Sequence, residues 1–105
     1  MANVYTYNGV MDAYGKHWML TEMEQVLAHM NKYKCKLDII TFKLLIDAYG
    51  KRQDFSKMEQ IFKSVLLSKE NPTLPTFNSM INNYGKANLM KKAELVYKKI
   101  TSLGY

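Results

Sequence analysis

The pentapeptide DAYGK occupies residues 12–16, recurs unchanged at residues 47–51, and appears as NNYGK at residues 82–86. The copies are 35 residues apart each time. A fixed period of about 20–50 residues is typical of a repeat architecture. Other positions keep the same register without a gap, including the glutamates Glu24, Glu59 and Glu94. The spacing therefore predicts a stacked array of three similar units.

Each unit contains two helical patterns. In the first, apolar residues recur at i, i+3, i+4 and i+7, which is the spacing of one helix face. The second pattern repeats this spacing about 16 residues later in each copy. The first helices carry these residues at Tyr7, Val10, Met11 and Tyr14 and their equivalents. The second helices carry them at Met23, Val26, Leu27 and Met30, with Ala93, Val96, Tyr97 and Ile100 in the last copy.

Several polar residues and helix breakers predict where the helices begin and end. The threonines Thr6, Thr41 and Thr76 stand where an N-cap is expected. Asp54 is a candidate cap for the second helix of the second copy, whereas Met19 and Leu89 cannot cap theirs. The glycines Gly15, Gly50 and Gly85 fall in the last turn of the first helices, where they permit close approach or a helix stop. Pro72 and Pro75 are expected to end any helix between the second and third copies.

The predicted fold is all-α: a right-handed α-α superhelix, or solenoid, of three stacked helical hairpins with six helices. Residues 1–105 form a single repeat array, in which residues 1–3 are the tail of a preceding repeat. The repeats span residues 4–38, 39–73 and 74–105, the last of them truncated. Glu59 with Lys63 and Glu94 with Lys98 are predicted ion pairs within second helices. Without a polar capping helix, both end hairpins would expose apolar surface, which predicts dimers or swapped hairpins.

Composition restricts the class of protein without deciding it. The net charge is +6 and the isoelectric point is about 9.4, which favours an anionic partner. One cysteine excludes an internal disulfide and a cysteine-rich zinc site. No apolar run approaches the ~18 residues of a membrane span. The first residues, MANVYTYN, have no signal or transit character.

Neither catalysis nor a cofactor or metal site is predicted. His17 and His29 have no carboxylate or thiol at ligand spacing. Cys35 lies between lysines, but no base or oxyanion device accompanies it. Trp18, in the turn between the first two helices, is interpreted as a packing residue rather than a stacking platform.

A polar stripe lies opposite the predicted core of each first helix. Asn8, Asp12 and Lys16 fall at i, i+4 and i+8 on one side of the first helix. Stacking would bring three such stripes side by side on one wall, with Lys16, Lys51 and Lys86 forming a row of positive charge. The alternative interpretation is an ordinary solvated face, in which each lysine meets the helix dipole.

The copies resemble pentatricopeptide repeats, which are 35-residue helical hairpins of organelle RNA-binding proteins. The similarity covers essentially the whole chain. It rests on Thr-Tyr/Phe-Asn at the start of the first helix, Tyr-Gly-Lys near its end, and Met/Ala-Glu followed by aliphatic residues in the second. Tetratricopeptide repeats differ in having 34 residues and a Trp-Leu-Gly signature that is absent here. The resemblance implies that each repeat binds one base of single-stranded RNA in organelle RNA maturation.

The resemblance also assigns base-recognition residues. One is the second residue of the first helix, and the other closes the repeat. Asn8 with Asp38 is similar to the family's uridine-preferring pair, whereas Lys43 with Thr73 is no recognised pair. The partner of Asn78 lies beyond Tyr105, and Asn3 would close a preceding repeat.

Further roles follow from the same resemblance. Base stacking between repeats is implied for Tyr5, Ile40 and Pro75. Phosphate contacts are implied for Lys16, Lys51 and Lys86. A chloroplast or mitochondrial location is implied, although this chain carries no targeting segment. The alternative function is a protein-interaction scaffold that holds a peptide in the concave groove of the solenoid.

Overall fold

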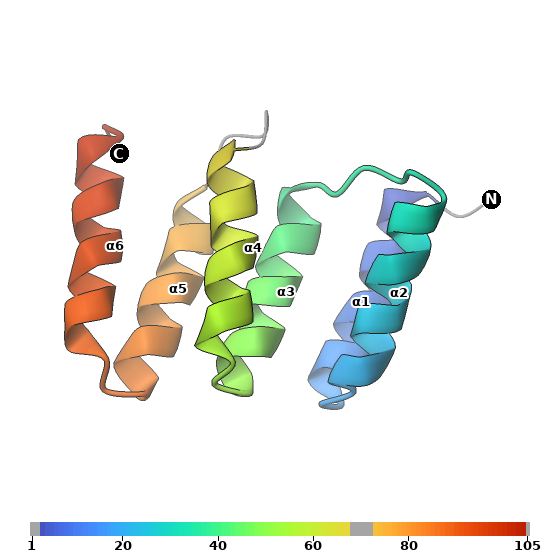
Figure 1. The fold of residues 1–105 in the computed structure, drawn as a ribbon, viewed down its shortest axis with the longest axis horizontal. Coiled ribbons are helices and arrows are strands. Elements are labelled where there is room, and N and C mark those ends of the chain that lie inside the picture. The colour runs from blue at the N-terminus through green and yellow to red at the C-terminus, as the bar shows by residue number, and fades with distance from the viewer. Residues whose placement is uncertain (1–2, 68–72, 105) are drawn as a thin grey trace.

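The computed structural model describes residues 3–67 and 73–104. Within these ranges the chain forms six helices of 13 residues each and no strand. They are α1 (Val4–Lys16), α2 (Leu20–Lys32), α3 (Ile39–Lys51), α4 (Phe55–Leu67), α5 (Leu74–Lys86) and α6 (Met90–Ser102) (Figure 1). The starts of α1, α3 and α5 are 35 residues apart, as are those of α2, α4 and α6. The prediction of six helices in three copies is confirmed.

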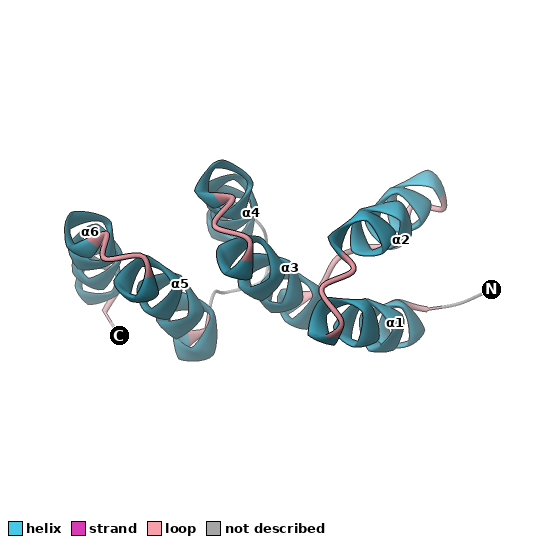
Figure 2. Ribbon diagram, turned by 90° about the horizontal axis from the view of Figure 1, so that it is seen from below, coloured by secondary structure: helices cyan, strands magenta, loops and turns pink. Residues whose placement is uncertain are grey.

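The helices form three stacked hairpins. Each odd-numbered helix packs against the even-numbered helix that follows it, and α3 also contacts α1 and α5. The first helices therefore form a continuous row, with α2, α4 and α6 on one side of it (Figure 2). The array measures 41 × 28 × 18 Å along its principal axes. This arrangement is an all-α repeat superhelix, as predicted.

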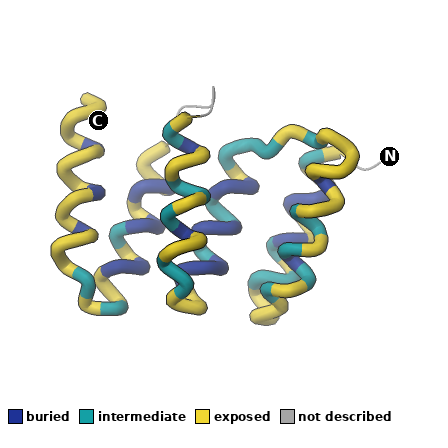
Figure 3. The backbone as a smooth tube through the Cα atoms, in the orientation of Figure 1, coloured by how far each residue is buried: buried dark blue, intermediate teal, exposed yellow. Residues whose placement is uncertain are grey.

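The core lies between the first and second helices and between successive first helices. Figure 3 shows buried residues concentrated on α3 and α5. Met11, Met23 and Met30 fill the first hairpin, because a flexible thioether side chain adapts to irregular gaps. Leu45 and Ile46 on α3 are fully buried, since α3 has neighbours on three sides.

Two predicted core residues are exposed. Val10 is 41% accessible, although its equivalents Leu45 and Met80 are fully buried. Tyr97 on α6 is 64% accessible. Both residues lie on hairpins at the ends of the row, where no further hairpin packs against these faces in the described part of the chain. The spacing of these two apolar residues is the one found in a repeat that has neighbours on both sides.

The N-caps lie three residues before the predicted threonines. They are Asn3, Asp38 and Thr73, and Asn3 and Asp38 accept hydrogen bonds from the backbone N–H groups of Thr6 and Thr41. The predicted N-cap role of Thr6, Thr41 and Thr76 is therefore wrong, because the helices begin one turn earlier. Asp54 does accept from the backbone N–H of Lys57, and neither Met19 nor Leu89 makes a side-chain cap, as expected.

The predicted helix breakers also need correction. Pro75 lies in the first turn of α5, where proline is tolerated because that backbone N–H has no helical partner. It therefore begins a helix rather than ending one, and Pro72 lies outside the described residues. The glycines do not stop their helices, which end one residue later. Gly50 is instead a close-approach site, because an added Cβ would overlap the Asn83 side chain on α5.

Glu59 connects three helices on the outer side of the stack. Its carboxylate accepts hydrogen bonds from the Tyr84 hydroxyl on α5 at 2.7 Å and from the Lys92 ammonium on α6 at 3.0 Å. The Lys92 Nζ also lies 5.8 Å from the centroid of the Tyr84 ring. The close ion pair of Glu59 is therefore with Lys92 rather than the predicted Lys63, although the Lys63 charge helps to lower the pKa of Glu59. Lys98 does pair with Glu94 at 3.5 Å. We call the set of Glu59, Tyr84 and Lys92 an outer clamp.

An equivalent outer clamp of Glu24, Tyr49 and Lys57 joins the first and second repeats. Lys57 on α4 lies 3.3 Å from the Glu24 carboxylate on α2 and 5.8 Å from the centroid of the Tyr49 ring. Burial raises the pKa of Tyr49 to about 12, with added contributions from the charges of Glu24 and Asp54 and from a hydrogen bond to Glu24. The tyrosines of the second and third Tyr-Gly-Lys triplets, Tyr49 and Tyr84, thus have a structural role in joining a repeat to the one before it.

The described helices include none with the length and apolar character needed to cross a membrane.

Candidate nucleic-acid interface

A groove separates the N-terminal halves of α1 and α3. Its volume is about 500 Å³, and its lining includes Tyr5, Asn8, Asp38, Ile40 and Lys43. The sequence analysis predicts a role in base recognition or base stacking for all five residues. Tyr5, Asn8, Ile40 and Lys43 lie on α1 and α3, and Asp38 is the N-cap of α3. Stacking of the first two repeats therefore brings together one complete set of predicted base-contacting residues.

Asn8 belongs to a hydrogen-bond network between the repeats. Its Nδ2 donates to Asp38 Oδ1 at 3.0 Å. The Thr41 hydroxyl lies 2.6 Å from Asn8 Oδ1 and 2.8 Å from Asp38 Oδ1, and its single hydrogen goes to one of them at a time. Asn8 is only 7% accessible and is the fifth residue of α1. The expectation that it lies second in the helix, on a wholly outward-facing stripe, is wrong.

The Asp38 carboxylate is held ionised by this network. Partial burial by itself would raise the pKa of Asp38, but hydrogen bonds from the Thr41 backbone, the Asn8 amide and the Thr41 hydroxyl outweigh burial and lower it. Asp38 also completes a capping box, since the Thr41 hydroxyl accepts from the Asp38 backbone N–H. One carboxylate thus caps α3, orients Asn8 and contributes a negative charge to the groove.

Two apolar side chains flank this network. Tyr5 is 83% accessible and Ile40 is also exposed, and both line the groove. Exposed apolar faces on either side of buried polar groups can hold a planar ring while its edge makes hydrogen bonds.

The other predicted recognition residues are arranged differently. Lys43 forms an ion pair with Asp47 at 3.0 Å, one turn along α3. Thr73 is the N-cap of α5, but its side chain makes no cap hydrogen bond to the backbone. Asn78 and Pro75 are exposed on α5. Asn3, at the other end of the array, is the N-cap of α1. The second repeat interface therefore lacks the network that joins Asn8 to Asp38.

The three lysines of the predicted row are each the last residue of a first helix. Lys16 pairs with Asp12 at 3.1 Å, and the Lys51 Nζ lies 5.7 Å from the centroid of the Trp18 ring. Lys86 is exposed and forms no ion pair with another described residue. Lys16 and Lys51 also line a second recess of about 230 Å³ between α1 and α3. This recess shares Asp12 and Leu44 with the larger groove, so the two adjoin.

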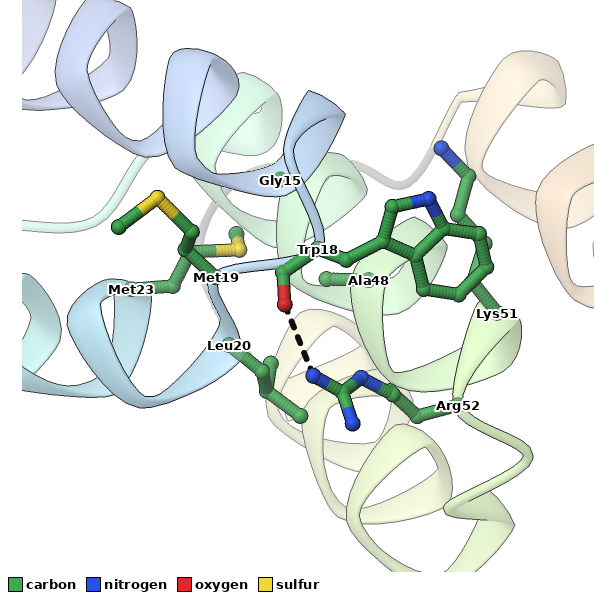
Figure 4. A pocket seen from close by; sticks show the side chains of 8 residues that line it. All are labelled: Gly15, Trp18, Met19, Leu20, Met23, Ala48, Lys51 and Arg52. Carbon is green, nitrogen blue, oxygen red and sulfur yellow. Dashed lines mark hydrogen bonds between the residues drawn. The ribbon is translucent and has the colours of Figure 1, made fainter.

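Trp18 and Arg52 line a separate small recess that also includes Lys51 (Figure 4). The Arg52 guanidinium donates to the Trp18 carbonyl oxygen at 2.8 Å. Trp18 is 55% accessible, so its interpretation as a packing residue is wrong. Sequence reasoning missed Arg52, which is the only arginine of the chain and directly follows Lys51 in the second copy.

No group of three or more histidine, cysteine, aspartate or glutamate residues converges as a metal site in the described ranges. His17 and His29 are exposed, and the Cys35 thiol is half-buried and free.

Comparison with known proteins agrees with the repeat pattern. Residues 2–51 match the model of the PPR repeat family, and residues 40–68 and 75–105 match the PPR repeat. The structure is similar to the crystal structure of the pentatricopeptide repeat protein PPR10 from maize, with a TM-score of 0.91 and 24% sequence identity. The match covers 97% of this chain but only 15% of that protein chain, and at this identity it concerns the fold. No curated protein matches the sequence.

Proposed function

Because the chain belongs to the pentatricopeptide repeat (PPR) family, we propose that its repeats bind single-stranded RNA with one nucleotide per repeat. The observation that carries the proposal is the groove between α1 and α3. The four residues that the family resemblance assigns to one base, Tyr5, Ile40, Asn8 and Asp38, all line it. Tyr5 and Ile40 would hold the base between them, and the polar pair would contact its edge.

The polar pair has the right chemistry for uracil. An asparagine amide has two hydrogens, and only one of those on Asn8 is needed for Asp38. A carboxylate has about four lone-pair sites, so Asp38 can accept a further hydrogen bond. The amide hydrogen suits a uracil carbonyl oxygen, and the carboxylate suits the uracil N3–H. The interactions that the base would need are thus compatible with the contacts already present.

Asn8→Thr is expected to shift the preference of the first position from uridine toward guanine, as the resemblance implies for a threonine–aspartate pair. One well-formed base-edge contact discriminates by about 1–3 kcal/mol. The measurement is the affinity of the variant for short RNAs that differ in one base. Because Asn8 also bonds to Asp38, the unfolding free energy of each variant is measured alongside. An equal change for all four bases would contradict base reading and favour the peptide-binding scaffold.

The lysine row is proposed to contact phosphates. If Lys16, Lys51 and Lys86 neutralise about three phosphates, log affinity should fall with log salt at a slope near −2 for a single strand. Replacing all three lysines with alanine is expected to flatten this slope, which titrations at several salt concentrations measure. A slope that does not change would mean that the row is only a solvated face.

We also propose that the longer protein acts in organelle RNA maturation, such as intron splicing, transcript stabilisation or processing. The proposal rests on the family resemblance. Sequencing RNA that co-purifies with the full-length protein from whole-cell extracts tests it. Recovery of cytosolic transcripts alone would overturn it.

Self-association is proposed on the basis of the exposed Val10 and Tyr97. Both occupy positions that are more buried in the second repeat. Sedimentation velocity at rising protein concentration tests the proposal, and a strict monomer throughout would refute it.

A further inference from the structure

Trp18 occupies a backbone position that does not favour tryptophan. It lies in the turn between α1 and α2 with a φ of 60°, in the left-handed region. Gln53 and Asn88 occupy the equivalent turns with φ values of 57° and 59°. Asparagine adopts this conformation readily, whereas a bulky side chain does so at a cost. The turn therefore gives no reason for an indole at this position, and the ring is largely exposed.

Two cations from the end of α3 contact Trp18, one at its ring and one at its backbone. The Lys51 Nζ lies 5.7 Å from the ring centroid, and Arg52 bonds to the Trp18 carbonyl oxygen at 2.8 Å. Figure 4 shows the indole beside both side chains rather than folded into the core. In the described part of the chain, neither cation forms an ion pair with a carboxylate. The charge of the pair is thus available to an anionic ligand.

The cluster is connected to the base-contacting groove. Its recess shares Gly15, Met23, Ala48 and Lys51 with the lining of the recess that adjoins that groove. Asn8 and Lys16, the last residue of α1, are eight positions apart, which is roughly 12 Å along the helix axis, and Trp18 lies in the turn just beyond Lys16. A single strand held in the groove can therefore place another of its nucleotides at Trp18.

We propose that Trp18, Lys51 and Arg52 form a second RNA contact, which takes one unpaired nucleotide outside the base-reading positions. The base would stack on the exposed indole, and its phosphate would contact the Lys51 ammonium or the Arg52 guanidinium. An aromatic ring combined with adjacent cations is the usual platform for single-stranded nucleic acid. Since stacking is tolerant of sequence, this contact adds affinity without base preference. The inference rests on the proposed RNA-binding function.

Trp18→Asn tests this contact without disturbing the turn, because asparagine already occupies the equivalent turn at Asn88. Gln53→Asn is the matched control, since it places the same residue in the equivalent turn of the second repeat. Affinities of the 105-residue chain are measured with oligouridylate and oligoadenylate by anisotropy. Trp18→Asn should weaken binding of both by about 5- to 100-fold. Gln53→Asn should leave both affinities within about twofold, and neither variant should be less stable than the wild type.

Trp18 is the only tryptophan, so its fluorescence reports directly on stacking. RNA should quench it in the wild type, whereas an abasic ribose-phosphate oligomer of equal length should quench it much less. Wild-type RNA binding without quenching, together with unchanged affinity in Trp18→Asn, would overturn this contact and leave the proposed function intact. That result is also the one expected if the cluster docks a protein. If the wild type binds no RNA at low salt, both proposals fail.

Discussion

Replacing Asp38 with alanine is expected to lower the free energy of unfolding by about 2–4 kcal/mol. The change removes the N-cap of α3 and the acceptor for Asn8 at the same time. Loss of an N-cap costs about 0.5–2 kcal/mol, and a buried polar group without a partner costs about 1–3 kcal/mol. Urea denaturation followed by circular dichroism measures the difference.

Thr73→Ala is the matched control for this prediction. Thr73 is the N-cap of α5, but its side chain makes no cap hydrogen bond to the backbone and instead lies 3.2 Å from the Thr76 hydroxyl, so its loss should cost about 0.5–1.5 kcal/mol, less than the loss of Asp38. Acid provides a second check. The pKa of Asp38 is lowered on folding, so its ionised form stabilises the fold above the unfolded pKa and loses this effect as pH falls. The difference in unfolding free energy between the wild type and Asp38→Ala should become smaller in acid. A difference that does not depend on pH would count against the network.

Gly50→Ala is expected to destabilise the array by about 1–3 kcal/mol. In an exposed helix position the same substitution stabilises by about 0.5–1 kcal/mol. The sign is reversed here because the new Cβ would overlap the buried Asn83 side chain at the contact between α3 and α5. Thermal and urea denaturation measure the effect.

Gly85→Ala is the internal control, since an added Cβ there meets nothing within 4 Å. Gly85→Ala should raise the free energy of unfolding by about 0.5–1 kcal/mol, as at other exposed helix positions. Asn83→Ala, made together with Gly50→Ala, should recover most of the loss because it removes the overlapping atoms. Alanine already occupies the corresponding position of the second repeat at Ala48. Equal effects of Gly50→Ala and Gly85→Ala would show that the close approach has no energetic consequence.

Helix positions and stacking were predictable because one period sets both. The apolar spacing within each copy determines two helix faces, and the 35-residue register places equivalent faces against one another. The helix starts were misplaced by one turn, since a threonine at N3 of a capping box resembles an N-cap in sequence. The exposed Val10 shows the limit of this reasoning: its apolar spacing is that of a core residue, but burial depends on a neighbouring hairpin.

The candidate site was predictable as a set of residues but not as a set of contacts. Asn8 and Asp38 were paired from the family resemblance, but the hydrogen bonds that join them to Thr41 depend on how the two repeats stack. Glu59 has a lysine four residues away in its own helix, yet it bonds to Tyr84 and Lys92. Such choices between local and distant partners are decided by side-chain geometry across a packed interface, which spacing alone does not encode.

The outer clamps give the array unequal stiffness on its two sides. The first helices form a spine of buried apolar contacts, whereas the clamps use partly exposed charged groups such as Lys57 with Glu24. An exposed ion pair contributes only about 0–1 kcal/mol and weakens as salt screens it. The array should therefore bend most easily by separating its second helices, and this bending should become easier as ionic strength rises. A strand held along the spine would then set the curvature of the whole superhelix.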